Sequence, residues 1–132
     1  MIEYQDNLDS ITPSMLEGFF VGWTNKPSPE KLFRLLKNSQ HIIIAVENKR
    51  IIGFINAISD QGLCAYIPLL EVLPDYQNQG IGKKLVNRLL KVLNEKYYMI
   101  DIVCDDNLTR FYEKFEFTKH TAMIRRNYKN LL

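Results

Sequence analysis

Residues 69–83 read LLEVLPDYQNQGIGK. An apolar run suited to a β-strand ends at Val72, a polar turn follows, and Gly80 and Gly82 stand where a helix should begin. The first turn of a helix carries backbone N–H groups without intrahelical partners, and the helix dipole makes that end positive. Glycines let a phosphate approach these groups closely. The stretch therefore predicts an anion site suited to a pyrophosphate.

Two glycines alone fit a plain strand-to-helix turn equally well. The stretch is not the dinucleotide-binding fingerprint, because the third glycine of that pattern is absent. It is not a P-loop either, because Lys83 is followed by a second lysine and not by Ser or Thr.

The clearest amphipathic helix follows this stretch directly. Apolar residues recur every four positions on one side, at Ile81, Leu85, Leu89 and Leu93. The other side is polar, with Lys83, Lys84, Asn87, Arg88 and Lys91. This spacing predicts a helix that buries one face.

The rest of the chain reads as alternating strands and helices. We expect strands at 2–6, 41–47, 50–59, 64–72, 98–103 and 117–126, and helices at 13–20, from Ser28 past Leu36, from Ile81 and at 108–115. The order is β-α-α-β-β-β-α-β-α-β. A strand, long helix and strand in the second half predict a parallel crossover in a mixed sheet. The expected fold is one α/β (α+β) domain over residues 1–132.

Composition excludes several classes of function. The formal charge of +2 is too small for a nucleic-acid groove, and no apolar run is long enough to span a membrane. The N-terminus lacks the basic start and apolar centre of a signal peptide, so a cytoplasmic location is the default expectation. Cys64 and Cys104 are expected to be reduced and packed as small apolar groups. No pattern of metal ligands is present, so no metal is expected.

Two motifs resemble the GNAT acetyltransferase family. Residues 77–82, QNQGIG, match the Gln/Arg-x-x-Gly-x-Gly/Ala signature of that family. Residues 107–117, NLTRFYEKFEF, resemble its late Asn…Phe-Tyr…Gly-Phe segment. With the hairpin before them, the matched parts cover roughly residues 42–117. The resemblance implies a central strand pair that splays apart, commonly at a β-bulge.

The resemblance also implies acetyl-CoA as the acetyl donor and a role for each matched residue. The strand residues Leu70, Glu71 and Val72 would pair with the pantetheine arm in the manner of an added strand. Asn107 would meet the same arm, and Tyr112 would protonate the leaving thiolate. The pyrophosphate would lie on the loop that carries Gln77, Asn78, Gln79, Gly80, Ile81, Gly82 and Lys83.

Transfer to nitrogen requires a neutral amine, whereas a primary alkylammonium has a pKa near 10.4. A base, or a chain of water molecules, must therefore remove a proton before attack. Glu71 is the first candidate, since it lies on the splayed strand near the expected thioester, and the other reading is a solvent-facing strand residue. Asp101 on the next strand is the alternative.

Two features depart from the family pattern. The spacing from Asn107 to Tyr112 is about two residues shorter than is common, which leaves open whether Asn107 reaches the cofactor. Glu116 stands where the family usually has glycine. A left-handed residue is commonly needed at such a helix end, and a non-Gly side chain there costs roughly 1 kcal/mol.

The expected acceptor is the primary amine of a small molecule. The alternatives are a protein N-terminus or lysine, or no acceptor at all in a non-catalytic CoA-binding module. An aromatic acceptor pocket from Phe19, Phe20 and Trp23 is one reading of that region, and plain core is the other. The end of the chain, Tyr128–Leu132, is expected to pack either on the domain or on a second copy in a homodimer.

Overall fold

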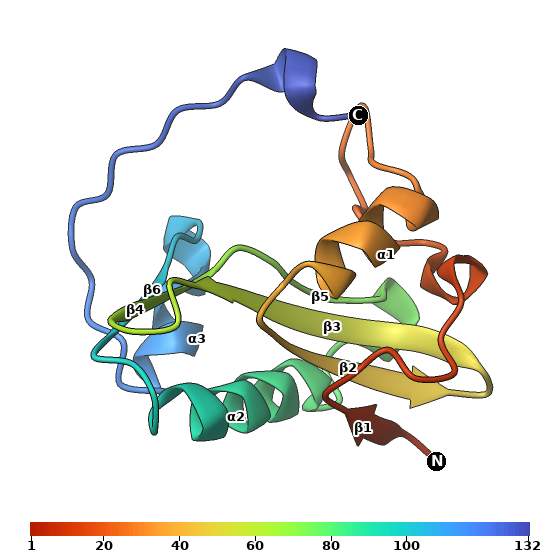
Figure 1. The fold of residues 1–132 in the computed structure, drawn as a ribbon, viewed down its shortest axis with the longest axis horizontal. Helices are drawn as coiled ribbons and strands as arrows, with labels where there is room; N and C mark the ends of the chain where they lie inside the picture. Colours follow the sequence, from red (N-terminus) through yellow and green to blue (C-terminus); the bar gives the residue numbers. More distant parts are fainter.

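Six strands form one mixed sheet, with α1 and α2 on opposite faces (Figure 1). The computed structural model describes residues 1–132. The strands are β1 (Glu3–Gln5), β2 (His41–Glu47), β3 (Arg50–Ser59), β4 (Cys64–Ile67), β5 (Leu70–Val72) and β6 (Met99–Ile102). The helices are α1 (Pro29–Lys37), α2 (Ile81–Leu93) and α3 (Thr109–Glu113). Short 3₁₀ turns are η1 (Pro13–Leu16), η2 (Pro74–Tyr76), η3 (Asp106–Leu108) and η4 (Tyr128–Asn130).

The sheet combines antiparallel hairpins with one parallel pair. The strand order is β1-β2-β3-β4-β6, and β5 pairs with β3. The neighbours from β1 to β4 are antiparallel, whereas β4 and β6 are parallel and α2 lies between them in the chain. The mixed sheet and the parallel crossover predicted from the sequence are therefore confirmed.

The core lies where the two helices cover the central strands. Helix α2 buries the apolar face that the sequence predicts and leaves its lysines outside. Ser28 caps α1 by accepting a hydrogen bond from the Lys31 N–H, and Leu32 and Leu36 of that helix are buried. Strand β3 is buried on both of its faces from Ile51 to Ala57. None of the helices has the length and apolarity that crossing a membrane would take.

The strand predicted over 64–72 is in fact two strands. Pro68 lies between β4 and β5, and a proline cannot donate a ladder hydrogen bond. The register shifts there: Gly53 faces Val72, but Ile58 faces Tyr66, so five steps along β3 oppose six on the other strand. This extra residue is a β-bulge.

The helix predicted over 13–20 is only the 3₁₀ turn Pro13–Leu16. Gly18 and Phe20 both have positive φ, at 94° and 62°, which a right-handed helix does not allow. The apolar residues that suggested a helix are buried all the same, because Leu16, Phe19 and Phe20 pack into the core.

The closing strand predicted over 117–126 is absent from the sheet. After Phe117 the chain leaves the body and arches around to α1, where η4 ends near the C-terminus (Figure 1). We call residues 118–127 the arch. Every residue from 118 to 130 is exposed, and β6 is paired on one side only. A strand needs a neighbour for its backbone groups, and the arch has none within the chain.

Candidate functional site

The site is built on the divergence of β5 from β6. The parallel pairing of β4 with β6 ends at Ile67 and Ile102, and β5 then pairs with β3 alone. One edge of β5 is therefore free to accept an extended ligand as an added strand. Leu70, Glu71 and Val72 make up this strand.

Asn56 holds the bulge that causes this divergence. Its side chain is 2% exposed, and its Oδ1 accepts a hydrogen bond from the Leu69 N–H at 3.1 Å. Its Nδ2 donates to Ser39 Oγ at 3.0 Å, while its backbone N–H donates to the Leu69 carbonyl. The amide replaces the ladder bond that the bulge breaks. Sequence reasoning missed Asn56. Two features of the sequence could have indicated it: Pro68 interrupts the strand expected at 64–72, and Asn56 is a polar residue within the apolar strand expected at 50–59.

The loop from Asn78 to Lys83 presents a row of free donors. Its backbone N–H groups donate no hydrogen bond within the chain, since the first bond of α2 runs from the Lys84 N–H to the Gly80 carbonyl. No acidic residue lies in the first turn of α2, and the N-cap Gly80 offers no side-chain acceptor. Donors and helix dipole together make this end attractive to an anion.

Gly80 gives the loop its shape. It has a φ of +83°, which favours glycine, and a Cβ there would meet nothing within 4 Å. The space on the side of Gly80 where a side chain would lie is therefore open. Gln77 supports the loop, because its Nε2 donates to the Val72 carbonyl at 3.0 Å. Gln79 makes a longer contact of 3.4 Å with the Asp75 carbonyl.

The separate segments predicted from the sequence meet at Gly82. A Cβ on this glycine would lie 3.9 Å from Val72 Cγ2 on β5 and 3.9 Å from Phe111 Cζ on α3. The strand edge, the N-terminal end of α2 and the helix that carries Tyr112 are thus adjacent.

Tyr112 has a buried ring and an accessible hydroxyl. The residue is 6% exposed, and its ring packs edge-on against Phe111 and Phe117, at centroid distances of 4.9 and 5.9 Å. Its hydroxyl has no partner in the protein, yet no fully buried side-chain oxygen lacks one, so the hydroxyl must reach solvent. Burial, with a smaller electrostatic contribution from Cys104, raises the pKa of Tyr112 to about 12. The phenol is therefore protonated across the physiological range.

Glu71 ties the strand edge to a loop far away in the sequence. Its carboxylate accepts hydrogen bonds from the N–H groups of Phe20, at 2.9 Å, and Val21, at 3.2 Å. Phe20 is a left-handed residue, so the carboxylate holds a strained turn in place. The Phe20 ring packs against Trp23, which is 45% exposed. Glu71 therefore faces the loop of residues 20–23, which we call the aromatic loop, and not open solvent.

Comparison with known proteins identifies the family. The profile of the acetyltransferase (GNAT) family matches residues 8–117. The chain belongs to the GNAT family.

Relatives of known sequence and structure agree with this GNAT membership. The N-acetyltransferase ycf52 of Pyropia yezoensis, itself uncharacterised, is 33% identical over 104 residues, which cover 75% of this chain and 59% of the relative. Histone acetyltransferase TAP1 of Glycine max is 34% identical over 110 residues, which cover 74% of this chain and 47% of the relative. The match thus spans about half to three-fifths of these relatives.

A solved structure resembles the GNAT chain over nearly its whole length. It belongs to a proposed acetyltransferase from Deinococcus radiodurans R1, with a TM-score of 0.91 and 41% identity. The alignment covers 98% of this chain and 91% of the other, so it extends into the segment after α3.

Asp101 and Asn107 lie at the margins of this GNAT site. Asp101 is exposed and faces Tyr66 in register, so it lies in the paired part of the sheet before β5 diverges. Asn107 is exposed within η3, which precedes the short helix α3. Neither residue makes a side-chain hydrogen bond within the chain.

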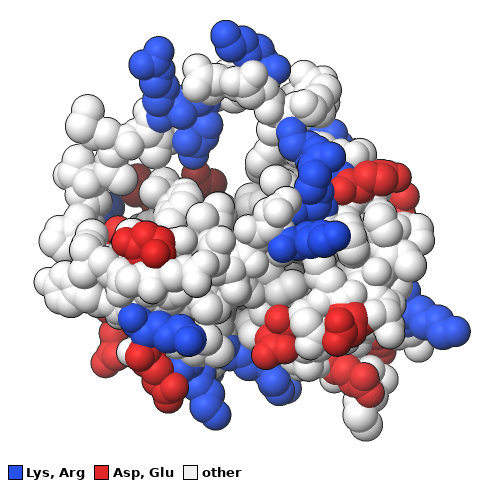
Figure 2. All heavy atoms as spheres, in the orientation of Figure 1, with Lys and Arg blue, Asp and Glu red and all other residues white.

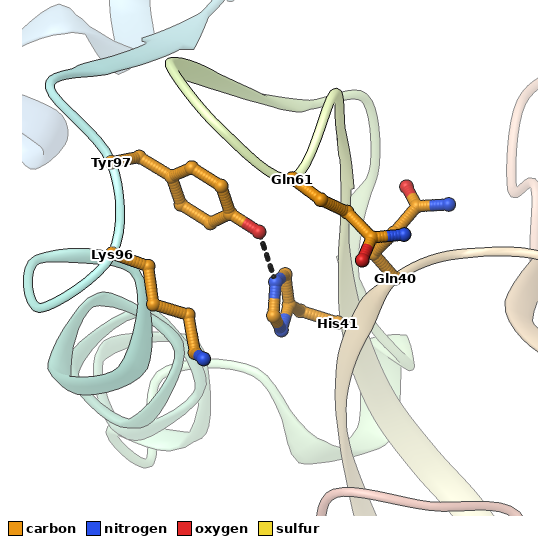
Figure 3. A pocket seen from close by; sticks show the side chains of 5 residues that line it. All are labelled: Gln40, His41, Gln61, Lys96 and Tyr97. Carbon is orange, nitrogen blue, oxygen red and sulfur yellow. Dashed lines mark hydrogen bonds between the residues drawn. The ribbon is translucent and has the colours of Figure 1, made fainter.

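A separate cavity of about 400 Å³ lies at the far end of α2 from Gly80 (Figure 3). Its lining is polar: Gln40, His41, Gln61, Lys96 and Tyr97. His41 Nε2 lies 2.7 Å from the Tyr97 hydroxyl, which also contacts Ser59 Oγ at 2.9 Å. Burial and the nearby Lys96 lower the pKa of His41, so this imidazole is neutral at pH 7. These contacts give His41 a structural role at the C-terminal end of α2.

Proposed function

We propose that the chain is an acetyl-CoA-dependent N-acetyltransferase that acts on the primary amine of a small molecule. The observation that carries this proposal is the run of free N–H groups from Asn78 to Lys83, adjacent to the unpaired edge of β5. A pyrophosphate on the first and an extended pantetheine arm on the second would satisfy both sets of backbone groups.

The residues present fit this cofactor. Gly80 leaves open space where phosphate oxygens would lie, and no carboxylate in the first turn of α2 opposes them. Gln77 braces the loop against β5. Asn107, one turn before α3, would contact the pantetheine arm only from the exposed rim of the site.

Bound acetyl-CoA supplies a thioester, whose acetyl group passes to the attacking amine while the sulfur leaves. Tyr112 donates its hydroxyl proton toward that sulfur, since its raised pKa keeps the phenol protonated. Glu71 takes the proton that the ammonium must lose. A carboxylate has about four lone-pair sites, and the N–H groups of Phe20 and Val21 use two, so it can still accept from the amine or from a water.

The acceptor enters on the side of the aromatic loop. Glu71 lies beneath Phe20 and Val21, and the exposed edge of Trp23 offers a surface for an organic cation. The soybean relative, by its name a histone acetyltransferase, favours a protein lysine as a second candidate acceptor.

Calorimetric titration with acetyl-CoA tests the cofactor site. We expect micromolar binding by the wild type and a loss of about 100-fold or more in Gly80→Glu, because the carboxylate would occupy the phosphate position. Gly22→Glu is the matched control: Gly22 has a φ of +86° and also nothing within 4 Å, but lies outside the loop. Absence of binding by the folded wild type, or equal losses in both variants, would refute the proposed site.

A second assay separates an enzyme from a non-catalytic CoA-binding module. Tyr112→Phe should bind acetyl-CoA like the wild type but lose turnover about 10²–10⁴-fold, the usual contribution of a general acid. Thiol release is measured with a panel of small amines and with histone-tail peptides. Turnover of peptides alone would favour the second acceptor. Unchanged turnover in Tyr112→Phe would remove the assigned acid.

A further inference from the structure

The polar cavity at the end of α2 is built from segments that the proposed acetyl transfer does not use. Gln40 and His41 come from the start of β2, Gln61 from the turn between β3 and β4, and Lys96 and Tyr97 from the connection between α2 and β6. Its volume of about 400 Å³ lies within the range of cavities that hold small molecules. Such cavities are mostly apolar, whereas only one of the five lining residues here is hydrophobic. A ligand in this cavity must therefore be recognised through polar contacts.

The walls of the cavity are fixed by hydrogen bonds. Asp60 Oδ1 accepts hydrogen bonds from the N–H groups of residues 62–64, at 2.9 to 3.0 Å. This carboxylate is thus turned into its own turn, and Asp60 does not line the cavity. The Leu63 carbonyl accepts from the N–H groups of residues 98 and 99, which ties the turn to the segment after α2. Little order is lost when a ligand enters walls that are already fixed.

A chain of hydrogen bonds orients the His41 ring. Its Nε2 lies 2.7 Å from the Tyr97 hydroxyl, which lies 2.9 Å from Ser59 Oγ, and this Oγ accepts from the Gln61 N–H at 3.1 Å. The other ring nitrogen, Nδ1, has no partner within the chain, yet no fully buried side-chain nitrogen lacks one, so Nδ1 is accessible. When the Tyr97 hydroxyl donates to Nε2, Nδ1 carries the imidazole proton and is a donor.

The other groups without partners around this ring are also donors. The Lys96 side chain extends toward the His41 ring and takes part in neither ion pair of the chain (Figure 3). Burial lowers the pKa of His41, and the charge of Lys96 lowers it further, so the ammonium lies close enough to act on the ring. Gln40 Oε1 accepts from the Ser59 N–H at 2.7 Å, which leaves the amide Nε2 of Gln40 as a free donor.

Negative charge does not counter these donors. No acidic residue lines the cavity. The dipole at the C-terminal end of α2 disfavours an anion, but the carbonyls of its last turn already accept hydrogen bonds. The Leu93 carbonyl accepts from the N–H groups of Lys96 and Tyr97, and the Leu90 carbonyl accepts from the Asn94 N–H. An anion in the cavity would therefore meet a positive charge and free donors.

We propose that this cavity binds a small molecule through an anionic group, with carboxylate or phosphate oxygens between Lys96 Nζ and His41 Nδ1. The ammonium supplies the charge and the fixed imidazole supplies a directed donor, and charge-assisted hydrogen bonds are the stronger kind. The side-chain amides of Gln40 and Gln61 would contact hydroxyl or carbonyl groups in the rest of the ligand. The site lies at the opposite end of α2 from Gly80 and does not depend on the proposed transfer reaction.

An NMR titration of the full chain tests this site, because the chain has only two histidines, His41 and His120. His120 lies in the exposed arch and serves as the internal control. Citrate and inorganic phosphate are titrated separately at fixed pH and ionic strength. We expect a saturable shift of the His41 imidazole signals with at least one of them, and none for His120. Saturation by phosphate alone would identify the bound group as a phosphate, and saturation by citrate alone as a carboxylate.

Two variants test where the anion is bound. Lys96→Gln removes the charge and should weaken binding about ten- to a hundredfold, the usual effect of losing a hydrogen bond to a charged group. Lys91→Gln is the matched control, because Lys91 is an exposed lysine of α2 that does not line the cavity, and it should leave binding unchanged. Gln61→Glu adds a carboxylate to the wall and should weaken binding by about tenfold or more. The change keeps the size of a side chain that is exposed, so the fold is retained.

Binding to the general basic surface would give different results. On the face shown in Figure 2, basic side chains gather over α1 and the end of the arch, where an anion could collect without a specific site. Such binding would shift His41 and His120 alike, or would weaken equally in Lys91→Gln and Lys96→Gln, and either result would overturn the proposal. The absence of a saturable His41 shift with both anions would overturn it too. Gly80→Glu should give the His41 shift of the wild type, and its loss there would assign the anion to the loop before α2 instead.

Discussion

At the scale of single residues, Glu116 is a point of backbone strain. Its φ is 69°, at the end of α3, and its N–H donates to the Glu113 carbonyl as the helix terminates. The sequence predicts a left-handed residue here, because the family motif usually has glycine at this position, and the structure confirms it.

Glu116→Gly should therefore stabilise the protein by a few tenths to about 1 kcal/mol, since glycine adopts this conformation without steric cost. The melting temperature should rise by roughly 1–4 °C. Glu113→Gly is the control, because that residue is the last one of α3 and does not have a positive φ, so the change should lower the melting temperature. An unchanged or lower value in Glu116→Gly would mean that the residue bears no strain.

Tyr112 links stability to pH. Its folded-state pKa of about 12 lies above the ordinary value of 10.0, because the fold buries the neutral phenol. A raised pKa means that this contribution is complete below pH 10 and is lost as the pH rises from 10 toward 12.

The free energy of unfolding should thus fall over that range by about 2–3 kcal/mol from this residue. Tyr112→Phe cannot ionise and should lose correspondingly less. Urea unfolding of both proteins between pH 9 and pH 12 (roughly the window set by the two pKa values) measures the difference. Parallel curves for the two proteins would contradict the assignment.

At the scale of elements, the bulge between β4 and β5 separates β5 from β6 and so opens the proposed cofactor site. Asn56→Leu keeps the number and branching of the side-chain heavy atoms but leaves the Leu69 N–H without its acceptor. We expect a loss of about 1–3 kcal/mol in stability and about tenfold weaker acetyl-CoA binding, because the strand edge would shift.

Ser39→Ala provides the matched control for this change. It removes the other partner of the Asn56 amide, at 3.0 Å, but leaves the bond to Leu69 intact. Ser39→Ala should lower the free energy of unfolding by about 1 kcal/mol without changing the affinity for acetyl-CoA. Equal affinities in Asn56→Leu and the wild type would show that the bulge does not position β5 for the ligand.

The elements also show what a sequence can predict. Strands β2 and β3 lie at their predicted bounds, because β-branched runs flank a two-residue turn whose residues, Asn48 and Lys49, both have positive φ. The loop before α2 was predictable from its glycines. The contacts of Glu71 were not, since Phe20 and Val21 lie about fifty positions away and bind through their backbones. The prediction of a strand over 117–126 was wrong for another reason. A local sequence pattern shows strand propensity, but it does not show which strand the segment would pair with.

At the scale of the whole molecule, the outer edge of β6 and the proposed cofactor site share one strand. β6 forms one side of the opening from which β5 diverges, and Tyr112 follows it after a short turn. A strand added to the outer edge of β6 would brace that side. Pairing of the arch with a second copy, in the homodimer expected from the sequence, would therefore make the stability of the site depend on assembly.

A homodimer held together by the arch would also make the melting temperature depend on protein concentration, because unfolding would then release two chains from one folded unit. Each tenfold increase in concentration should add about 1.4 kcal/mol per dimer, which corresponds to a rise of roughly 2–4 °C for two chains of this size. Differential scanning calorimetry across a dilution series measures the slope. Met123→Pro removes a backbone N–H of the arch and should give a flat line, whereas Met123→Val keeps that N–H and should give the slope of the wild type. A flat line for all three proteins would mean that the arch contributes nothing to folding stability through a second copy, and the shared-strand argument would fail with it.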